Sequence, residues 1–207
     1  MSHPVFARIY SRSSEATERA GASGHRDRLL TGLSGRIIEI GAGSGLSFAH
    51  YPDTVTEVLA VEPEPYLRRL ADRASHHAPV PVRVVDGDAD HLPAEDESFD
   101  GAVVSLVLCS VPDQVPALRE IHRVLIPRGQ LRFYEHVRSH NQRQARVQDR
   151  IDWVWSHIAG GCHANRDTTA AIEDNGFRIS QCSRFDFRPR STSGPTAPHI
   201  LGEAVRL

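Results

Sequence analysis

A β-branched run that ends in a glycine-rich loop is the feature that most constrains this chain. Residues 36–40 read Arg-Ile-Ile-Glu-Ile and predict a short buried strand, and residues 41–45 follow as Gly-Ala-Gly-Ser-Gly. Glycines at alternate positions permit positive φ and let a ligand lie directly against the main chain. We expect a helix to begin near Gly45, with free N–H groups in its first turn. Alone, such a loop also occurs as a purely structural strand-to-helix connection, so its surroundings decide its meaning.

Strand and helix patterns alternate through the remainder of the chain. One or two N-terminal helices, broken near Gly21 and Gly24, are expected between residues 6 and 33. Strands are predicted at 36–40, 55–61, 82–85, 99–108, 130–136, 177–187 and 200–205, and helices at 65–75, 114–125, 143–158 and 167–175. This alternation predicts parallel βαβ units in a three-layer α/β sandwich. Residues 189–198 are rich in Ser, Pro and Gly and predict a flexible loop.

Composition excludes several classes of protein. The 207 residues carry a formal net charge of −2 and show no basic stripe, so no nucleic-acid partner is expected. Three cysteines without Cys-x-x-Cys spacing argue against a disulfide framework and against a structural metal site, and we expect no metal. The chain shows neither a long apolar run nor a secretory pattern, so we expect a cytoplasmic protein without an integral membrane segment.

Two acidic residues follow the next two predicted strands. Glu62 lies about twenty residues beyond the glycine loop, where a carboxylate can accept hydrogen bonds from the hydroxyls of a ribose. Asp88 follows the strand at 82–85, where it can accept from the exocyclic amine of an adenine, although it can equally be a turn residue. Because parallel strands end at the same edge of a sheet, these groups are expected to share one crevice with the glycine loop. Together they indicate an adenosine-containing ligand.

The spacing of the glycines in the loop distinguishes between two kinds of adenosine-containing ligand. A dinucleotide site favours G-x-G-x-x-G around a pyrophosphate, whereas this loop reads E-x-G-x-G-x-G with Glu39 before the first glycine. A carboxylate at this position repels a pyrophosphate but can organise a loop around a cationic methionine group. The pattern favours S-adenosylmethionine and leaves a nicotinamide oxidoreductase as a remote alternative.

Four motifs in this half of the chain resemble the class I S-adenosylmethionine-dependent methyltransferases of the methyltransferase type 11 kind. They are IIEIGAGSGLSF (37–48), AVEPEPYLRRLA (60–71), VVDGDADHLPAEDESFDGAVVSLVLCSVPD (84–113) and LREIHRVLIPRGQLRFYEHV (118–137). The resemblance implies a Rossmann-like seven-stranded sheet, mostly parallel, with the last strand antiparallel. It also implies one methyltransferase domain over residues 1–207, with an N-terminal helical segment (1–33), a cofactor-binding core (34–137) and an acceptor-side segment (138–207).

The family's cofactor residues carry over onto matching positions of this chain. S-adenosylmethionine is the implied cofactor, with S-adenosylhomocysteine as its product. The implied contacts are Glu39, Gly41, Ala42, Gly43 and Gly45 around the methionine part, Glu62, Pro63 and Tyr66 at the ribose, Asp88 and Ala89 at the adenine, and Ser105 and Leu106 beneath the sulfonium centre.

Outside the cofactor half, the chain is similar to a narrower group that includes the alkyl thiol S-methyltransferases. The motifs are LVLCSV (106–111), FYEHV (133–137), a helix with two tryptophans, GGCHANRDT (160–168) and PHILGEAV (198–205). The resemblance implies methyl transfer to a small-molecule acceptor, with a thiol favoured. The group has an N-terminal membrane-associated segment that this chain is expected to lack, and it also resembles quinone and phospholipid methyltransferases. An O- or C-methyltransferase acting on a quinone or natural product, and a non-catalytic cofactor-binding partner subunit, remain as alternatives.

Candidate residues for the acceptor side follow the cofactor motifs. His136 is a candidate general base and Cys109 a second candidate catalytic residue, although His136 can be a structural histidine and Cys109 a small buried apolar residue. Candidates for contact with the acceptor are Trp153, Cys162, His163 and Arg166. Trp153 can instead fill the core, Arg166 can pair with Asp167 or Glu173, and neighbouring residues such as Cys162 and His163 seldom bind one metal ion together. Methyl transfer from an activated donor does not require a dedicated base.

Overall fold

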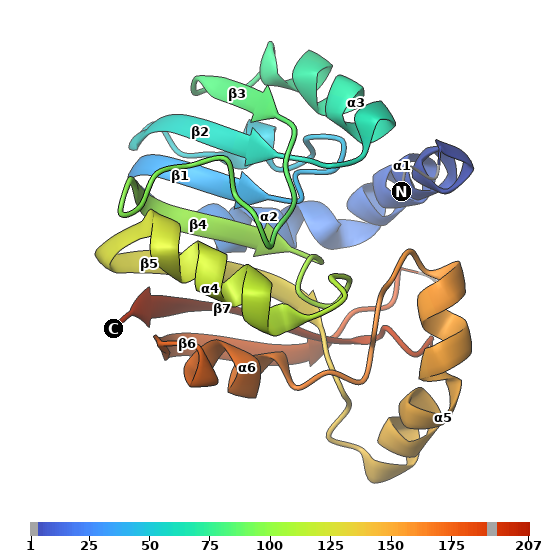
Figure 1. The fold of residues 1–207 in the computed structure, drawn as a ribbon. Coiled ribbons are helices and arrows are strands. Elements are labelled where there is room, and N and C mark those ends of the chain that lie inside the picture. Colours follow the sequence, from blue (N-terminus) through green and yellow to red (C-terminus); the bar gives the residue numbers. More distant parts are fainter. Residues whose placement is uncertain (1–3, 190–193) are drawn as a thin grey trace.

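A computed structural model of the chain describes residues 4–189 and 194–207 (Figure 1). The N-terminal part forms two helices, α1 (Pro4–Thr17) and α2 (Ser23–Leu30), joined by a π-helical turn (Glu18–Ala22). The strands that follow are β1 (Gly35–Ile40), β2 (Val55–Val61), β3 (Val82–Val85), β4 (Phe99–Ser105), β5 (Leu125–His136), β6 (Phe177–Asp186) and β7 (Pro198–Arg206). The helices between them are α3 (Pro65–Ser75), α4 (Gln114–Val124), α5 (Gln142–Ile158) and α6 (Thr168–Asp174).

One seven-stranded sheet organises the molecule. Its strand order is β3-β2-β1-β4-β5-β7-β6. The pairs from β3 to β5 are parallel, whereas β7 runs antiparallel to both β5 and β6. The expected three-layer Rossmann-like sandwich with a reversed last strand is therefore confirmed. The order places β1 and β4 side by side with their connections leaving in opposite directions, which is where folds of this kind open a crevice for a ligand.

Helices cover both faces of this sheet because alternate residues of the central strands point to opposite sides. On one face, Ile38 and Ile40 of β1 lie in a core cluster with Leu118 and Ile121 of α4. On the other face, Ile37 lies in a second cluster that includes the leucines of α2 and Ala71 of α3. Figure 1 shows α4 in front of the sheet and α2 behind it. Burial on both faces explains why the central strands are almost continuously apolar.

The helix that the sequence predicted after the glycine loop does not form. Between β1 and β2 the structure has only a 3₁₀ turn, Phe48–His50, and Tyr51 is extended with φ −66° and ψ 131°. Tyr51 precedes Pro52, and the proline ring disfavours the helical conformation of the residue before it. Because only six residues separate Gly45 from Pro52, there is no room for more than one turn.

Other boundaries differ by smaller amounts. Gly21, at φ 118°, interrupts the N-terminal helices, whereas Gly24 continues inside α2. Strand β4 ends at Ser105 rather than at Leu108, because Leu106 takes a positive φ of 61° and turns the chain away. The loop predicted at 189–198 falls partly outside the described residues, which exclude 190–193. Within the described parts of the chain, none of the helices combines the length and the apolar character needed to cross a bilayer.

Candidate cofactor and acceptor site

A cavity of about 510 Å³ opens at the carboxyl ends of β1, β2 and β4. Residues predicted to contact the methionine and ribose parts of the cofactor line it: Gly41, Gly43, Glu62 and Pro63. Residues predicted for the adenine and the sulfonium centre line it as well: Asp88, Ala89, Ser105 and Leu106. The volume is within the range of about 300–1,000 Å³ that is usual for small-molecule and cofactor sites. The structure thus brings together most of the positions expected from the motifs.

Glu62, the first residue after β2, is the one buried carboxylate in the cavity wall among the described residues; its residual exposure is 5%. Its Oε2 accepts a 2.8 Å hydrogen bond from the N–H of Gly43, and its Oε1 accepts a 2.9 Å bond from the N–H of Glu64. Each oxygen retains a further acceptor position. Burial raises the pKa of Glu62 to about 7, although the two main-chain hydrogen bonds act to lower it. The carboxylate is therefore fixed in place and still able to accept from a diol.

The glycine loop is held against the end of β2. The N–H groups of Gly41 and Ala42 both donate to the carbonyl of Val61, at 2.8 and 3.1 Å. Gly41 has φ 66°, and a Cβ added there would lie 2.5 Å from Cγ2 of Val107. Glycine is required at this position both for the backbone conformation and for the close approach of the loop that follows β4.

Gly45 and Tyr66 do not line the cavity. A Cβ on Gly45 would lie 2.7 Å from the ring of Phe48 and 2.9 Å from Cβ of Ala74, so this glycine allows the loop to pack against its neighbours. The Tyr66 ring makes cation–π contacts with the guanidinium groups of Arg8 and Arg69, which lie 5.7 and 5.8 Å from its centroid. Both residues thus have packing roles in this structure.

Glu39 faces a separate small hollow of about 20 Å³, which Ala42, Gly41, Gly43 and Ser105 also line. Its carboxylate is buried and accepts a 2.8 Å hydrogen bond from the hydroxyl of Tyr51. Burial raises the pKa of Glu39, partly offset by this bond. This hollow shares Gly41, Gly43 and Ser105 with the main cavity, so Glu39 borders the methionine end of the predicted site without lining the cavity itself.

A third buried carboxylate, that of Glu135, holds the loop after β4. Glu135 of β5 is fully buried, and its two oxygens accept from the N–H groups of Val107, Leu108 and Cys109, each at 3.0 Å. Burial raises the pKa of Glu135, and the three main-chain bonds act in the opposite direction. The loop that carries Leu106 and Val107 into the cavity wall is thereby fastened to the neighbouring strand.

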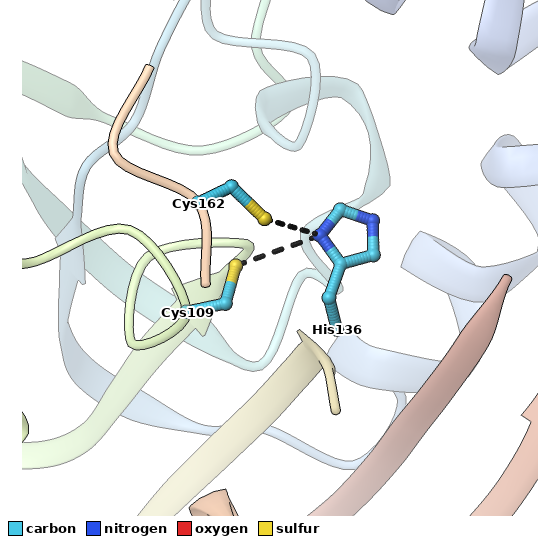
Figure 2. Close-up of side chains that lie close together, drawn as sticks. All are labelled: Cys109, His136 and Cys162. Atoms are coloured by element: carbon cyan, nitrogen blue, oxygen red, sulfur yellow. Dashed lines mark hydrogen bonds between the residues drawn. The ribbon is translucent and has the colours of Figure 1, made fainter. Parts of the chain in front are cut away.

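The two candidate catalytic residues are Cys109, which belongs to this loop, and His136 at the end of β5; neither lines the cavity. They meet Cys162: the Nδ1 atom of His136 is 3.6 Å from Sγ of Cys109 and 3.3 Å from Sγ of Cys162 (Figure 2). Both thiols are buried and free. Contact with the Cys109 thiol lowers the pKa of Cys162, whereas that contact and burial raise the pKa of Cys109. Sequence spacing gave no reason to group these residues, because they come from three separate segments.

The remaining acceptor-side candidates have other positions. Trp153 is 75% exposed on α5. His163 pairs with Asp152 at 2.7 Å. Within the described ranges Arg166 pairs with neither Asp167 nor Glu173; its guanidinium donates to the carbonyls of Leu108, at 2.6 Å, and Pro112, at 3.0 Å. None of the three lines the cavity, and Arg166 supports the same loop that Glu135 holds.

Part of the cavity wall was not predicted. The further residues that line it are Ile40, Leu67, Gly87, Asp90, Val107, Ser110, Val111, Pro112, Asp113, Pro116, Ala117, Ala159 and Gly160. Most of them lie within the motifs, but a motif does not indicate which of its side chains face a ligand. Gly160 comes from the end of α5, far along the chain, and only the tertiary fold brings it there.

The sheet order, the glycine loop and the buried carboxylate after β2 together define a class I S-adenosylmethionine-dependent methyltransferase, an enzyme whose cofactor is S-adenosylmethionine and whose product is S-adenosylhomocysteine. Comparison with known proteins gives the family. Residues 38–133 match the methyltransferase domain family. The chain is 32% identical to the thiol S-methyltransferase TMT1B of Rattus norvegicus, over 98% of this chain and 83% of the relative. It belongs to the family of S-adenosylmethionine-dependent methyltransferases that includes this enzyme.

Two further similarities agree with this assignment. The human thiol S-methyltransferase TMT1A is 30% identical over 97% of this chain and 83% of its own length. Among solved structures, an S-adenosylmethionine-dependent methyltransferase of Thermotoga maritima, described as a possible histamine N-methyltransferase, superposes with a TM-score of 0.72. It is 22% identical and covers 98% of this chain and 97% of its own, so it supports the fold alone.

Proposed function

We propose that this enzyme transfers the methyl group of S-adenosylmethionine to the sulfur of a small thiol. The observation that carries the proposal is the similarity over nearly the whole chain to a thiol S-methyltransferase, which extends through the acceptor-side segment as well as the cofactor half. The cavity is consistent with a small acceptor: beyond the expected cofactor positions, its wall includes Val111, Pro112, Ala159 and Gly160, together with the exposed carboxylates of Asp90 and Asp113. The first four groups suit the apolar part of an acceptor.

We further propose how the cavity holds the cofactor. The two free acceptor positions of Glu62 bind the ribose hydroxyls, and Asp88 with Ala89 borders the adenine. The main chain of Gly41 and Gly43 lies against the methionine part, and Glu39 borders that end of the site. Ser105 and Leu106, at the end of β4, lie beside the sulfonium centre. Gly45 and Tyr66, which the resemblance includes, contribute to packing around this site.

The sulfonium cofactor supplies an activated methyl group, so the chain has to align the acceptor and exclude water. In such a transfer a carbon–sulfur bond to the acceptor would form as the methyl–sulfonium bond broke, and the electron pair of that bond would return to the donor sulfur. The acceptor's proton would leave to solvent beforehand, because a small fraction of a thiol is ionised at neutral pH and the thiolate is the nucleophile. The loop held by Glu135 and Arg166 forms the rigid wall against which the acceptor is placed.

A panel of acceptors tests this assignment. The purified enzyme is given labelled S-adenosylmethionine with small alkyl thiols, matched alcohols and phenols, and a demethylated quinone, and the products are identified by mass spectrometry. We expect methyl thioethers from the thiols, with the matched alcohols unchanged. Methyl groups only on oxygen or carbon would assign the enzyme to the O- or C-methyltransferases instead. Cofactor binding without turnover on any acceptor would favour a partner-subunit role.

We also propose that the protein works in the cytoplasm. The support is chemical: its three cysteines are free, although Cys109 and Cys162 lie close together around His136. A reducing compartment keeps such neighbouring thiols from pairing. Localisation of a tagged chain by cell fractionation tests the proposal.

A further inference from the structure

Three side chains from distant segments converge on one point behind the cavity wall. Cys109 follows β4, His136 ends β5, and Cys162 follows α5. Figure 2 shows both sulfur atoms directed at the same ring nitrogen of His136. The ligand atoms of the three residues all lie within 4.8 Å of one another. We propose that Cys109, His136 and Cys162 bind one Zn²⁺ ion, with a fourth coordination position left to a small ligand such as water or a thiolate.

The distances match a tetrahedral metal site. Zinc binds sulfur at about 2.3 Å and imidazole nitrogen at about 2.0–2.1 Å, so two such ligands at the tetrahedral angle are about 3.6 Å apart. The observed distances from Nδ1 of His136 to the two sulfur atoms are 3.6 and 3.3 Å. Both nitrogen–sulfur distances therefore match a bound ion to within a few tenths of an ångström. The two sulfur atoms lie within 4.8 Å of each other and would have to be about 3.8 Å apart around the ion.

The chemistry of the donor set selects the ion. Two thiolates and an imidazole are soft or intermediate ligands, which Zn²⁺ prefers and which Mg²⁺ and Ca²⁺ do not. Two thiolates also balance the charge of a divalent ion in a buried place. Three protein ligands with an open fourth position are typical of catalytic rather than structural zinc sites.

The main chain around the three ligands is organised to hold them. The N–H of Cys109 donates to Glu135, and the carbonyl of Cys109 accepts a 2.7 Å bond from the N–H of His163. Gly161, at φ 89°, makes this approach possible, since a Cβ there would lie 2.6 Å from the carbonyl oxygen of Ser110. A residue other than glycine would push the segment that carries Cys162 away from the segment that carries Cys109.

A buried donor beside the cluster points in the same direction. The indole N–H of Trp155 is buried without a hydrogen-bond acceptor in the described part of the chain. It lies beside Cys162. A metal-bound thiolate carries negative charge, which a neighbouring N–H group stabilises.

The site adjoins the cavity without belonging to the cofactor contacts. Ser110, next to Cys109, and Gly160, two residues before Cys162, both line the cavity. The proposed ion thus lies directly behind the acceptor end of the wall. Metal binding is independent of which acceptor the enzyme methylates, and the two proposals are tested separately.

Metal titration of the full-length protein tests the proposal. The protein is reduced, stripped with a chelator, and titrated with Zn²⁺ by calorimetry and with Co²⁺ by visible absorption. We expect one ion per chain, with the strong visible bands of tetrahedral Co²⁺ and a sulfur-to-cobalt charge-transfer band. Cys109→Ser, Cys162→Ser and His136→Asn should each weaken binding by more than about 100-fold, beyond the 10–100-fold that loss of a supporting group costs. Cys182→Ser, which removes the exposed third cysteine on β6, should bind as the parent does.

Several results would overturn the proposal. The first is that the reduced protein binds no stoichiometric metal ion. The second is that the Cys109 and Cys162 variants bind the ion as tightly as the parent and Cys182→Ser do. The third is a Cys109–Cys162 disulfide in protein isolated without oxidant. Binding of S-adenosylhomocysteine, measured by calorimetry on each variant, shows whether the fold is intact. If only one variant fails to fold, the remaining two and the cobalt spectrum of the parent still decide the question.

Discussion

The main-chain N–H of Gly43 donates a 2.8 Å hydrogen bond to Oε2 of Glu62. This bond joins the glycine loop after β1 to the acidic residue after β2, two elements that the motifs place nineteen residues apart. It fixes the carboxylate at the cavity wall while leaving acceptor positions for a ligand. The proposed cofactor site therefore depends on the loop and Glu62 as one unit.

Removing the Glu62 carboxylate should abolish most cofactor affinity. Two hydrogen bonds to a charged acceptor contribute about 1.5–3 kcal/mol each, so Glu62→Ala should weaken S-adenosylhomocysteine binding by at least about 100-fold. Isothermal titration calorimetry measures the change. Glu57→Gln alters an exposed carboxylate on the same strand and should leave the affinity unchanged. Unaltered binding by Glu62→Ala would remove Glu62 from the proposed site.

Cofactor affinity should rise with pH through neutrality. Burial raises the pKa of Glu62 to about 7, so at pH 6 only about one chain in ten carries the carboxylate that accepts from the ribose. The dissociation constant should therefore be about tenfold larger at pH 6 than at pH 8. Calorimetry across this range tests the dependence, and Glu62→Gln should lose it.

The raised pKa of Glu62 also determines how the stability of the cofactor-free protein changes with pH. The pKa of Glu62 is 4.5 in the unfolded chain and about 7 in the folded chain. Between pH 4.5 and pH 7 the folded state therefore binds more protons at this residue than the unfolded state does. The contribution of Glu62 to stability is therefore present below pH 4.5 and declines as the pH rises to about 7. Urea unfolding of the parent and of Glu62→Gln at several pH values isolates this contribution; an opposite slope would contradict the assignment.

Alanine at Gly41 should damage both the fold and the site. The positive φ of 66° costs about 1–2 kcal/mol for a residue with a Cβ, and the added atom would overlap Val107 at 2.5 Å. We expect the free energy of unfolding to fall by about 2 kcal/mol or more, together with cofactor affinity. The matched control is Gly24→Ala inside α2, where nothing lies within 4 Å and φ is ordinary. That variant should be more stable by about 0.5–1 kcal/mol.

Glu135 should be essential for the loop after β4. Its carboxylate accepts three main-chain N–H bonds. In Glu135→Gln one of the two oxygens is replaced by an NH₂ group, which cannot accept a hydrogen bond from a main-chain N–H. We expect a loss of about 2–3 kcal/mol in the free energy of unfolding, measured with urea, because a buried N–H is left unsatisfied. Glu95→Gln, a change at an exposed position, is the control. A stability equal to that of the control would show that the loop does not need the charge.

The motifs predicted the cofactor half closely for a physical reason. The strand β1, the glycine loop and Glu62 are short-range features, in which local sequence decides both the backbone conformation and the direction of the chain. The expected helix after Gly45 was wrong because the short distance to Pro52 outweighs the usual strand-to-helix pattern. Gly45 and Tyr66 match the family motif, yet their contacts are to neighbouring side chains rather than to the cavity.

On the acceptor side, local sequence predicted much less of the structure. Trp153 and Arg166 were chosen by residue type, but exposure and hydrogen bonding depend on how α5 and the following loop dock, which local patterns do not encode. Likewise Cys109, His136 and Cys162 are separated by 27 and 26 residues, respectively. Their meeting requires the parallel neighbours β4 and β5 to end together and the Gly161 segment to return over them.

The sequence by itself determined the fold class and the cofactor, because alternating apolar periodicity and the glycine loop are local properties of the chain. The reversed last strand was implied by the resemblance of the motifs to a known family. Only the tertiary structure decided which predicted residues share the cavity, which ones support it from behind, and that two thiols and an imidazole meet beside it. Those relationships are between segments far apart in sequence, and they arise when strand ends and loops pack at one edge of the sheet.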